Sequence, residues 1–585
     1  MKTFAHDQAL PRLPLASPES LCNAVPALAA PLLDEATLSA TLDVLSDFVR
    51  QDGDAEKLHN ALAAHRGSLP ANSSWLRPFW DDSYLAWREP LPLNMNYCFH
   101  LDREHWGGGV EHFIMRIART AALLGKNALE AERNRSGYQA MDQARSAFYS
   151  RIPGLGADEL MAVPLLAPVH ITVLCQGFFF LLPLYGSSGE ALSAGSLAQC
   201  LNSVRDEAAR LAGRGTQVSW TGAMTTAPRE QAAALRATLK RSQVNRLTLT
   251  ALEQSLLVLC LDSAAASNGH FAQKLLAGDA KNRWFDKSLQ VIATEEGRFG
   301  INLEHAGCDA GIWAWLLEKA AALGDEQCAP ENKPLPYRRL DWELDETVTT
   351  ELTDLAENFQ QQNDAIELAQ EVFCEFSREA LKGMRTSPDA FLQVCFQLAQ
   401  FEVFGELRSS YESVSMRGYA QGRTECARGS TQAALTLAEA LRRNEQPSTL
   451  YELYRKAERA HLGRLVSCQR GQAVERYVYG LQNMFRQKGK ALGITSEPAF
   501  FSDPGWLKIK HDSLSTSGMA VDGVLAFAFA PVVEDGFGIG YVPGKNQTVV
   551  TVTSFHVSGM KARDFAKAFG SAAQRIAGLL RTTKG

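Results

Sequence analysis

The chain has 585 residues, and its 59 Lys and Arg residues against 65 Asp and Glu residues give a formal net charge of −6. A hydrophobic fraction of 46% with 21% charged residues supplies a large core and excludes a disordered chain. The sequence has no basic excess to follow a phosphate backbone, so its charge argues against a nucleic-acid binder. At about 150 residues per domain, this length allows up to about four domains.

The cysteines and the N-terminus indicate the compartment. The 11 cysteines are scattered, with no CxxC pair and no metal-like Cys/His block, which is typical of reduced thiols in an intracellular protein. The first residues lack the apolar core of a signal peptide and the Arg/Ser-rich bias of a transit peptide. The longest apolar stretch, 170–185, is too short to span a bilayer as a helix. We therefore expect a soluble cytoplasmic protein with no metal, no membrane span and no nucleic-acid partner.

The first half of the chain is predicted to begin with helices and to continue with both strands and helices. Apolar residues at helical spacing predict amphipathic helices over about the first 65 residues. The prolines of 87–92 exclude a continued helix, and we place a domain crossover near residue 85. The stretch 170–185 predicts two buried strands and a turn, followed by helix to about residue 215. The apolar segment 252–267 fits a buried helix or a strand, and its pattern does not decide between them.

A hairpin and a helix start follow in the middle of the chain. Strand-like residues at 288–293 and 298–304 flank a turn at 294–297, which is a hairpin signal. Asp309 directly precedes an apolar helical run, in a capping or first-turn position. The proline-rich stretch 328–344 indicates a second crossover between domains.

The last part of the chain is predicted to be helical and then stranded. Helices are expected to dominate from about 346 to 445, strands to follow over 523–556, and a helix to close the chain near 560–582. Strands mixed with helices in both halves predict two α/β units.

The fragment Glu304-His305-Ala-Gly-Cys-Asp309 carries the clearest chemistry. A histidine that leaves a strand, with a carboxylate four residues later at a helix start, can be held in one orientation toward a cleft. An imidazole titrates near neutrality, which suits a general base acting on a hydroxyl or a thiol. The same pattern also fits a buried histidine bonded to a helix cap. Cys308 is the rival nucleophile, but no second histidine is placed to activate it, so we interpret it as a bystander.

Several multi-residue motifs accompany this fragment in a fixed order. They are Leu10-Pro-Arg-Leu-Pro14, Ser150-Arg-Ile-Pro-Gly154, Asn282-Arg-Trp-Phe-Asp-Lys-Ser-Leu-Gln290, Ser387-Pro-Asp-Ala-Phe391, Tyr411-Glu-Ser413, Gly422-Arg-Thr424, Ser515-Thr-Ser517 and Phe529-Ala-Pro-Val-Val533. Together they resemble the choline/carnitine O-acyltransferase family, and the resemblance runs through nearly the whole chain. Several motifs in the right order are far more specific than any one of them.

The resemblance implies a fold of two chloramphenicol-acetyltransferase-like α/β units, each a mixed sheet with flanking helices, around an active-site tunnel. The unit 86–345 would carry the catalytic histidine. The other unit would be discontinuous, formed by 1–85 plus 346–585, and would hold the coenzyme A and carnitine contacts. Coenzyme A or acyl-CoA is then a co-substrate, with no tightly bound cofactor. We expect small-molecule substrates as partners and a monomeric protein.

The resemblance also implies the catalytic roles. His305 matches the general base that deprotonates the hydroxyl of carnitine, or the thiol of coenzyme A in reverse, with no covalent acyl-enzyme. Asp309 matches the acid that holds the imidazole. Ser515, Thr516 and Ser517 match hydroxyls that hold carnitine and donate to the oxyanion, and Ser517 is the expected oxyanion donor. Without the family, the three residues would be a polar turn or a strand edge.

Coenzyme A needs cations for its phosphates. Arg378 and Lys382 are four residues apart on a predicted helix, so both can reach one phosphate from the same face. They match the coenzyme-binding lysines of the family, with Arg in place of the first Lys. Ser387 and Asp389 belong to the adjoining motif, where Asp389 matches a coenzyme-contacting acid. A charged pair on a helix is otherwise a solvated face.

Carnitine carries a carboxylate that choline lacks, so a carnitine enzyme needs a buried cation facing it. Arg476 aligns with the arginine that binds this carboxylate in the family, and Tyr411 and Thr424 align with its hydroxyl partners. The usual Asp-Arg-His of the family reads Glu475-Arg476-Tyr477 here. Phe529 aligns with the aromatic residue near the trimethylammonium group, where a cation–π contact is expected; core packing is the alternative.

The acyl pocket is expected at Phe527, at the position where long-chain relatives have a small residue. A bulky ring there predicts acetyl or other short chains. The resemblance therefore favours reversible transfer of a short acyl group between coenzyme A and L-carnitine. The alternatives are choline O-acetyl transfer, medium-chain transfer to carnitine, and an inactive acyl-CoA/carnitine-binding protein of the same fold.

Overall fold

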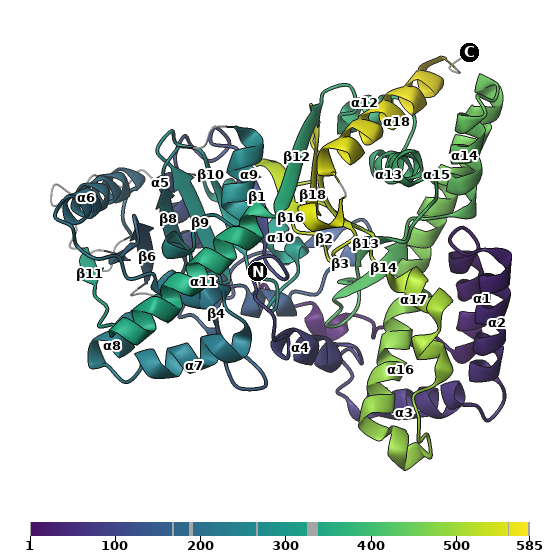
Figure 1. Ribbon diagram of the computed structural model, residues 1–585, viewed down its shortest axis with the longest axis horizontal. Helices are drawn as coiled ribbons and strands as arrows, with labels where there is room; N and C mark the ends of the chain where they lie inside the picture. Colours follow the sequence, from purple (N-terminus) through teal and green to yellow (C-terminus); the bar gives the residue numbers. More distant parts are fainter. Residues whose placement is uncertain are drawn as a thin grey trace.

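The computed structural model describes residues 2–166, 169–185, 191–264, 267–324, 337–559 and 561–582. Its frame is two mixed sheets flanked by helices (Figure 1). This arrangement confirms the predicted α/β class of two chloramphenicol-acetyltransferase-like units. In the described part of the chain, no helix is long and apolar enough to cross a membrane.

The first sheet has eight strands. In spatial order they are β11 (Arg338–Leu340), β7 (Phe178–Pro183), β6 (His170–Cys175), β8 (Val258–Asp262), β9 (Leu289–Thr294), β10 (Phe299–Leu303), β1 (Tyr97–Leu101) and β16 (Val524–Phe529). The hairpin expected over 288–304 is confirmed, because β9 pairs antiparallel with β10 and residue 293 lies opposite residue 299. The ambiguous segment 252–267 contains the end of a helix and then β8, whose parallel neighbours on both sides explain its nearly unbroken apolar sequence.

The second sheet has six strands. In spatial order they are β12 (Ile366–Phe373), β18 (Thr548–Phe555), β17 (Phe537–Pro543), β15 (Leu514–Gly518), β13 (Ser410–Ser415) and β14 (Thr424–Arg428). The strands expected over 523–556 are confirmed as β16, β17 and β18. The helical expectation for 346–445 needs correction, because β12, β13 and β14 lie between its helices. The sequence of β13, SYESVS, alternates buried with more exposed residues, but its polar composition hides this period of two.

The helices cover both sheets. Those before residue 330 are α1 (Pro18–Ala29), α2 (Glu35–Val49), α3 (Asp54–Ser68), α4 (Arg77–Leu85), α5 (Val110–Gly125), α6 (Ala194–Gly213), α7 (Arg229–Leu239), α8 (Gln243–Glu253), α9 (Asn268–Leu276) and α10 (Ala310–Leu323). The later ones are α11 (Glu346–Asp364), α12 (Arg378–Gly383), α13 (Pro388–Phe404), α14 (Gln432–Arg442), α15 (Pro447–Gln469), α16 (Glu475–Lys488), α17 (Pro504–Lys510) and α18 (Ala562–Thr582). The predicted N-terminal helices and the closing helix are confirmed. Short two-stranded ladders join β2 (Arg133–Asn134) to β3 (Gly137–Tyr138) and β4 (Tyr149–Ile152) to β5 (Glu159–Ala162).

The strand β16 ties the two halves of the chain together. Its sequence neighbours β15 and β17 belong to the second sheet, but β16 pairs antiparallel with β1 at the edge of the first sheet. Figure 1 shows β16 beside β1 in the middle of the molecule. The proposed boundaries, 1–85 plus 346–585 and 86–345, stay a prediction. Part of the proline-rich crossover at 328–344 lies outside the described residues.

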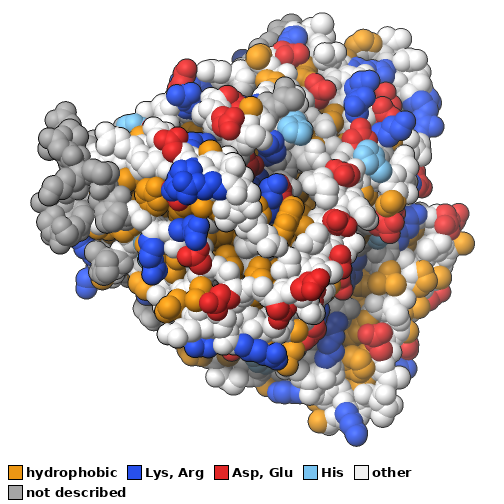
Figure 2. Space-filling view, turned by 60° about the vertical axis from the view of Figure 1, so that its left-hand side comes forward, with side chains coloured by type: hydrophobic (Ala, Val, Ile, Leu, Met, Phe, Trp, Pro, Cys, Tyr) orange, Lys and Arg blue, Asp and Glu red, His pale blue; other side chains and the backbone are white. Residues whose placement is uncertain are grey.

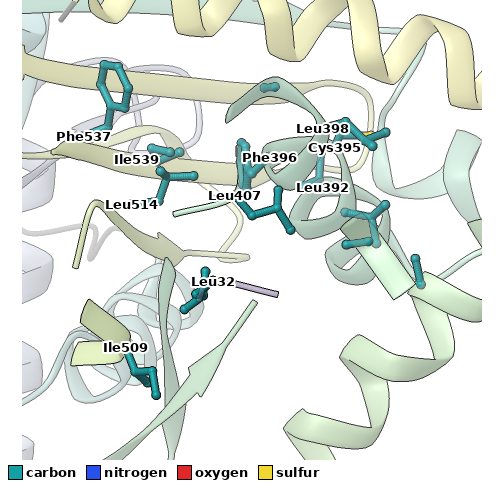
Figure 3. Close-up of a cluster of buried hydrophobic side chains, with 14 of the residues drawn as sticks. Leu32, Leu392, Cys395, Phe396, Leu398, Leu407, Ile509, Leu514, Phe537 and Ile539 are labelled. Carbon is teal, nitrogen blue, oxygen red and sulfur yellow. The ribbon is translucent and has the colours of Figure 1, made fainter. Parts of the chain in front are cut away.

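The core of the second half forms around α13. Phe396 on this helix packs against Tyr541 of β17 at a ring distance of 5.6 Å and against Phe569 of α18 at 4.8 Å. Figure 3 shows Leu392 and Phe396 of α13 near apolar residues of the second sheet. The helix is therefore enclosed between the sheet and α18, which explains why its residues 390–401 are all buried.

The N-terminal helices pack against helices from the C-terminal part of the chain. α3 contacts α16, and α1 and α2 contact α17, so the first 65 residues cover the second half (Figure 1). On the face shown in Figure 2, acidic and basic side chains are intermixed. This distribution agrees with the nearly balanced charge of the sequence.

Candidate functional site

The candidate base His305 lies in the turn between β10 and α10. Asp309 is the N-cap residue of α10, as its sequence position predicts. Its own backbone N–H donates to Oε1 of Gln143 at 2.8 Å. The carboxylate makes no side-chain cap bond to the helix, which leaves it available to other partners.

The imidazole of His305 is held in a mostly apolar setting. Its ring is 29% exposed, and Nδ1 lies 3.9 Å from Oδ1 of Asp309, beyond hydrogen-bond length. Tyr84 stacks on the ring at 5.4 Å, and Tyr97 meets it edge-on at 5.2 Å. Burial lowers the pKa of His305 below its ordinary value, although Asp309 acts in the opposite direction. The ring is therefore neutral at neutral pH, which is the state a general base requires.

Arg423 fixes the carboxylate of Asp309. Its Nε and Nη2 donate to the two carboxylate oxygens, each at 3.0 Å, and a further N–H donates to Asp81 at 3.2 Å. Burial is the largest single effect on Asp309 and opposes its ionisation, but Arg423 and other nearby groups together lower the pKa of the carboxyl. Arg423 is 1% exposed, so this is a buried bidentate pair. The sequence contains this arginine in the Gly422-Arg-Thr424 motif, but its role was missed.

The neighbouring thiol is unreactive. Cys308 is fully buried, and burial raises its pKa to about 12. A thiol of this kind holds its proton near neutrality and is a poor nucleophile. The interpretation of Cys308 as a bystander agrees with this environment.

The expected alcohol-binding residues lie together. Nη2 of Arg476 donates to the hydroxyl of Tyr411 at 3.2 Å, and its Nε donates to the backbone oxygen of Thr424 at 3.3 Å. Trp80, which was not predicted to belong to the site, faces the guanidinium at 4.3 Å. Among the described residues, no carboxylate forms an ion pair with Arg476 within 4.0 Å. Its charge is thus left to hydroxyl, backbone and aromatic partners.

Glu425 follows directly after Thr424 and accepts from the backbone N–H of Arg476 at 3.3 Å. Burial raises the pKa of Glu425 to about 7, with Arg476 acting in the opposite direction. This carboxyl therefore approaches the neutral state near physiological pH. A Glu425 that is partly protonated neutralises the charge of Arg476 less than an ionised carboxylate would.

The residues of the Ser-Thr-Ser motif divide between two faces of β15. Side chains alternate along a strand, so Ser515 and Ser517 share one face and Thr516 has the other. Thr516 is fully buried, and its hydroxyl donates to the backbone oxygen of Tyr411 at 2.8 Å and accepts from Gln393 at 2.9 Å. The hydroxyl of Thr516 is thus engaged within the fold. Ser517 is the more accessible of the two serines.

The aromatic residues of β16 lie beside the histidine. The ring of Phe527 packs against Phe99 at 5.1 Å and against Tyr97 at 5.9 Å. Tyr97 in turn contacts His305. Phe529 packs against Phe527 at 5.4 Å and is partly buried. One aromatic cluster therefore connects the predicted acyl pocket to the predicted base.

The predicted coenzyme residues occupy α12 and the start of α13. Arg378 and Lys382 are the first and fifth residues of α12, and their side chains are 28% and 57% exposed. Lys382 pairs with Glu379 at 3.2 Å. Ser387 is the N-cap of α13, and its hydroxyl accepts from the backbone of residue 390. Lys382 is exposed and Arg378 is partly exposed, 3.9 Å from Asp522, so both remain accessible to a phosphate.

Asp389 belongs to a compact polar cluster with Glu412, His461 and Tyr541. The Tyr541 hydroxyl donates to Asp389 at 2.7 Å, and Nε2 of His461 lies 3.3 Å from Glu412 and 3.6 Å from Asp389. Asp389, Glu412 and His461 could together hold a cation, because their ligand atoms lie within 4.8 Å of one another. Burial raises the pKa of Glu412 far above its ordinary value, and Asp389 adds to the effect. Glu412 therefore tends to hold its proton, which lowers the negative charge of the cluster.

Comparisons with known proteins match nearly the whole chain. A family model described as Choline/Carnitine o-acyltransferase matches residues 13–571. Carnitine O-acetyltransferase of Homo sapiens is 27% identical, covering 92% of this chain and 88% of the relative. Choline O-acetyltransferase of Sus scrofa and carnitine O-palmitoyltransferase 2, mitochondrial, of Xenopus tropicalis are each 26% identical, with 92% and 87% coverage. The first condensation domain of the CDA synthetase aligns over 90% of this chain and 94% of its own, at 9% identity and a TM-score of 0.35.

Proposed function

Because the chain belongs to the choline/carnitine O-acyltransferase family, we propose that it reversibly transfers a short acyl group, preferably acetyl, between coenzyme A and the hydroxyl of L-carnitine. Acyl-CoA is a co-substrate in this reaction, and no tightly bound cofactor takes part. The observation that carries the choice of carnitine is Arg476, whose partly buried charge has no carboxylate ion-pair partner among the described residues.

The chemical step is direct transfer. His305 takes the proton of the carnitine hydroxyl, and the oxygen attacks the thioester carbonyl. The tetrahedral intermediate then expels the thiolate of coenzyme A, which receives the proton back from His305. Ser517 donates to the oxyanion, a contribution of about 10²–10³ in rate for such a donor. The neutral, partly exposed imidazole supports this role.

Arg476 favours carnitine over choline. Arg476 is only partly buried, but a bound substrate would remove it further from water, and a substrate carboxylate would offset the cost of that desolvation. Tyr411 and Thr424 contact the same guanidinium and would complete the carboxylate site. Choline offers no anion to this site, so it would leave Arg476 unpaired. Phe529 would face the trimethylammonium group that both alcohols share.

Phe527 supports a short acyl chain. Its ring is 4% exposed and is enclosed by Phe99, Tyr97 and Phe529. A longer chain would have to displace this ring from a packed cluster, which costs free energy that a short chain does not. Medium-chain transfer is therefore the less favoured alternative.

Arg378 and Lys382 would bind phosphates of coenzyme A, with Ser387 and Asp389 beside them. The side chains of both cations are accessible. In this proposal the coenzyme approaches His305 from the α12 side, and carnitine approaches from the Arg476 side. The domain division predicted above, with a tunnel between its two units, is part of the same proposal.

The test is thiol release from acetyl-CoA, measured with carnitine, with choline and with buffer alone. We expect turnover with carnitine to exceed the other two, and the His305→Ala variant to lose it. Faster turnover with choline would overturn the role of Arg476. Full activity of His305→Ala would overturn the mechanism. Coenzyme binding without turnover on either alcohol would favour the inactive binding protein.

A further inference from the structure

We propose that Glu304 and Tyr149 are positioning residues that hold the peptide on both sides of His305 and so set the direction of its imidazole. This inference rests on the proposed function and adds to it. Both residues are buried, Glu304 fully. They act through the backbone of the 304–307 turn.

The contacts clamp the turn at each end. The carboxylate of Glu304 accepts from the backbone N–H of Ala306 at 3.0 Å and from the hydroxyl of Tyr149. The same hydroxyl lies 3.1 Å from the backbone oxygen of Glu304 and accepts from the N–H of Gly307 at 3.0 Å. One carboxylate and one hydroxyl thus connect the peptide groups before and after His305.

The surroundings of Glu304 require a carboxylate. Its neighbours are a guanidinium N–H of Arg151 at 2.8 Å, the N–H of Ala306 and the hydroxyl of Tyr149. The first two can only donate, Arg151 to Oε1 and Ala306 to Oε2. An amide at this position would direct an NH₂ group at a donor. Glutamine therefore keeps the shape of Glu304 but cannot satisfy its partners.

A chain of buried charges anchors the clamp. Arg151 also donates to Asp158 at 2.7 Å, and Arg229 connects Asp158 to Asp286 through two contacts of 2.7 Å each. The side chains of Arg151, Asp158 and Arg229 are completely inaccessible. Alternating signs keep such a network stable only while all members are paired. The turn at His305 is therefore fixed to a rigid frame.

Packing at Gly307 leaves the turn little freedom. A Cβ atom at this position would lie 2.3 Å from the Tyr149 ring and 2.6 Å from the backbone oxygen of Ser146. The ring of Tyr149 thus fills the space into which the turn would otherwise relax. Its hydroxyl and its ring both restrict the same peptide.

The experiment compares Glu304→Gln and Tyr149→Phe with wild type in steady-state acetyl transfer. Misplacement of a reacting group by about 1 Å can cost about 10²-fold, so we expect kcat to fall by about 10- to 10²-fold with both KM values little changed. The matched control is Asp262→Asn, which also places an amide in a buried arginine pair, with Arg283 at 2.7 Å. Asp262 contacts Arg283 and Asn282, so this control should lower stability but keep kcat per folded molecule.

The pH profile separates positioning from loss of structure. Glu304 raises the pKa of His305, so its removal should move the acid limb of kcat/KM to lower pH. The Asp262→Asn control, which only lowers stability, should leave that limb at its wild-type pH. Wild-type kcat and pH profile in Glu304→Gln, beside an inactive His305→Ala, would overturn the inference and leave the proposed function intact. Absence of turnover in wild type would instead overturn the proposed function, and the positioning role with it.

Discussion

Two arginines of the site, Arg423 and Arg476, have opposite partners. Arg423 donates to both oxygens of Asp309 and to Asp81, so carboxylates neutralise it completely. Arg476 contacts a tyrosine hydroxyl, a backbone oxygen and the face of Trp80. A paired buried charge gives rigidity, whereas an unpaired one is available to a ligand. The contrast separates the part of the site that holds the base from the part that would hold the substrate.

The largest effect is expected at the unpaired arginine. The variant Arg476→Gln removes the cation that would face the carboxylate, and kcat/KM for carnitine should fall by about 10³-fold, the size of a lost buried charge pair. Activity with choline should be retained or rise, because choline presents no anion. Steady-state rates with both alcohols check this. An equal loss with carnitine and choline would mean that Arg476 is structural, like Arg423.

Arg423→Met tests the paired arginine. It leaves Asp309 buried without its counter-ion, so the free energy of unfolding should fall by about 3–5 kcal/mol and kcat by about 10²-fold. Arg423 lowers the pKa of His305, so its loss should raise that pKa and move the acid limb of kcat/KM to higher pH. Denaturant unfolding and pH–rate profiles measure these effects. An acid limb that stays at its wild-type pH would break the link between Arg423 and the base.

The sequence predicted the elements whose patterns are local. The hairpin before His305 and the N-cap position of Asp309 follow from local patterns, whereas the grouping of Tyr411 and Thr424 with Arg476 was implied by the resemblance to the family. The α/β class, predicted from strands mixed with helices in both halves of the sequence, is also confirmed. The domain boundaries, the monomeric state and the cytoplasmic location stay predictions.

The remaining features depend on contacts between distant residues. Asp309 and Arg423 are 114 positions apart, and no local pattern pairs them. Trp80 reaches Arg476 because α4 lies against α16, where the hydroxyl of Tyr479 donates to the backbone oxygen of Phe79 at 2.9 Å. The opposite orientation of Thr516 was available from strand alternation once β15 was recognised as a strand. The strands β13 and β14 of that sheet are short and polar, so the hydrophobic pattern did not predict them.

Phe527 is expected to control acyl chain length, a property that depends on neither arginine. The variant Phe527→Gly should shift the preference from acetyl toward longer acyl-CoA by about 10-fold or more, because each accommodated methylene is worth about 1 kcal/mol or more. Thermal unfolding should show a loss of stability, since a buried ring is removed. Turnover with a series of acyl-CoA chain lengths is the measurement. An unchanged chain-length preference would remove Phe527 from the acyl pocket.

The smallest effect is expected at Lys382 of α12, because it is more exposed to solvent than either arginine of the site. The side chain of Lys382 is 57% exposed, and both Lys382 and Arg378 lie within ion-pair distance of Glu379. The variant Lys382→Ala should raise KM for acetyl-CoA several-fold, with kcat and KM for carnitine unchanged. Salt screens exposed charges over about 10 Å at 0.1 M, so this difference should shrink as salt is added, whereas the Arg476→Gln defect should persist. A salt-independent defect at Lys382 would mean that the lysine is enclosed when the coenzyme binds.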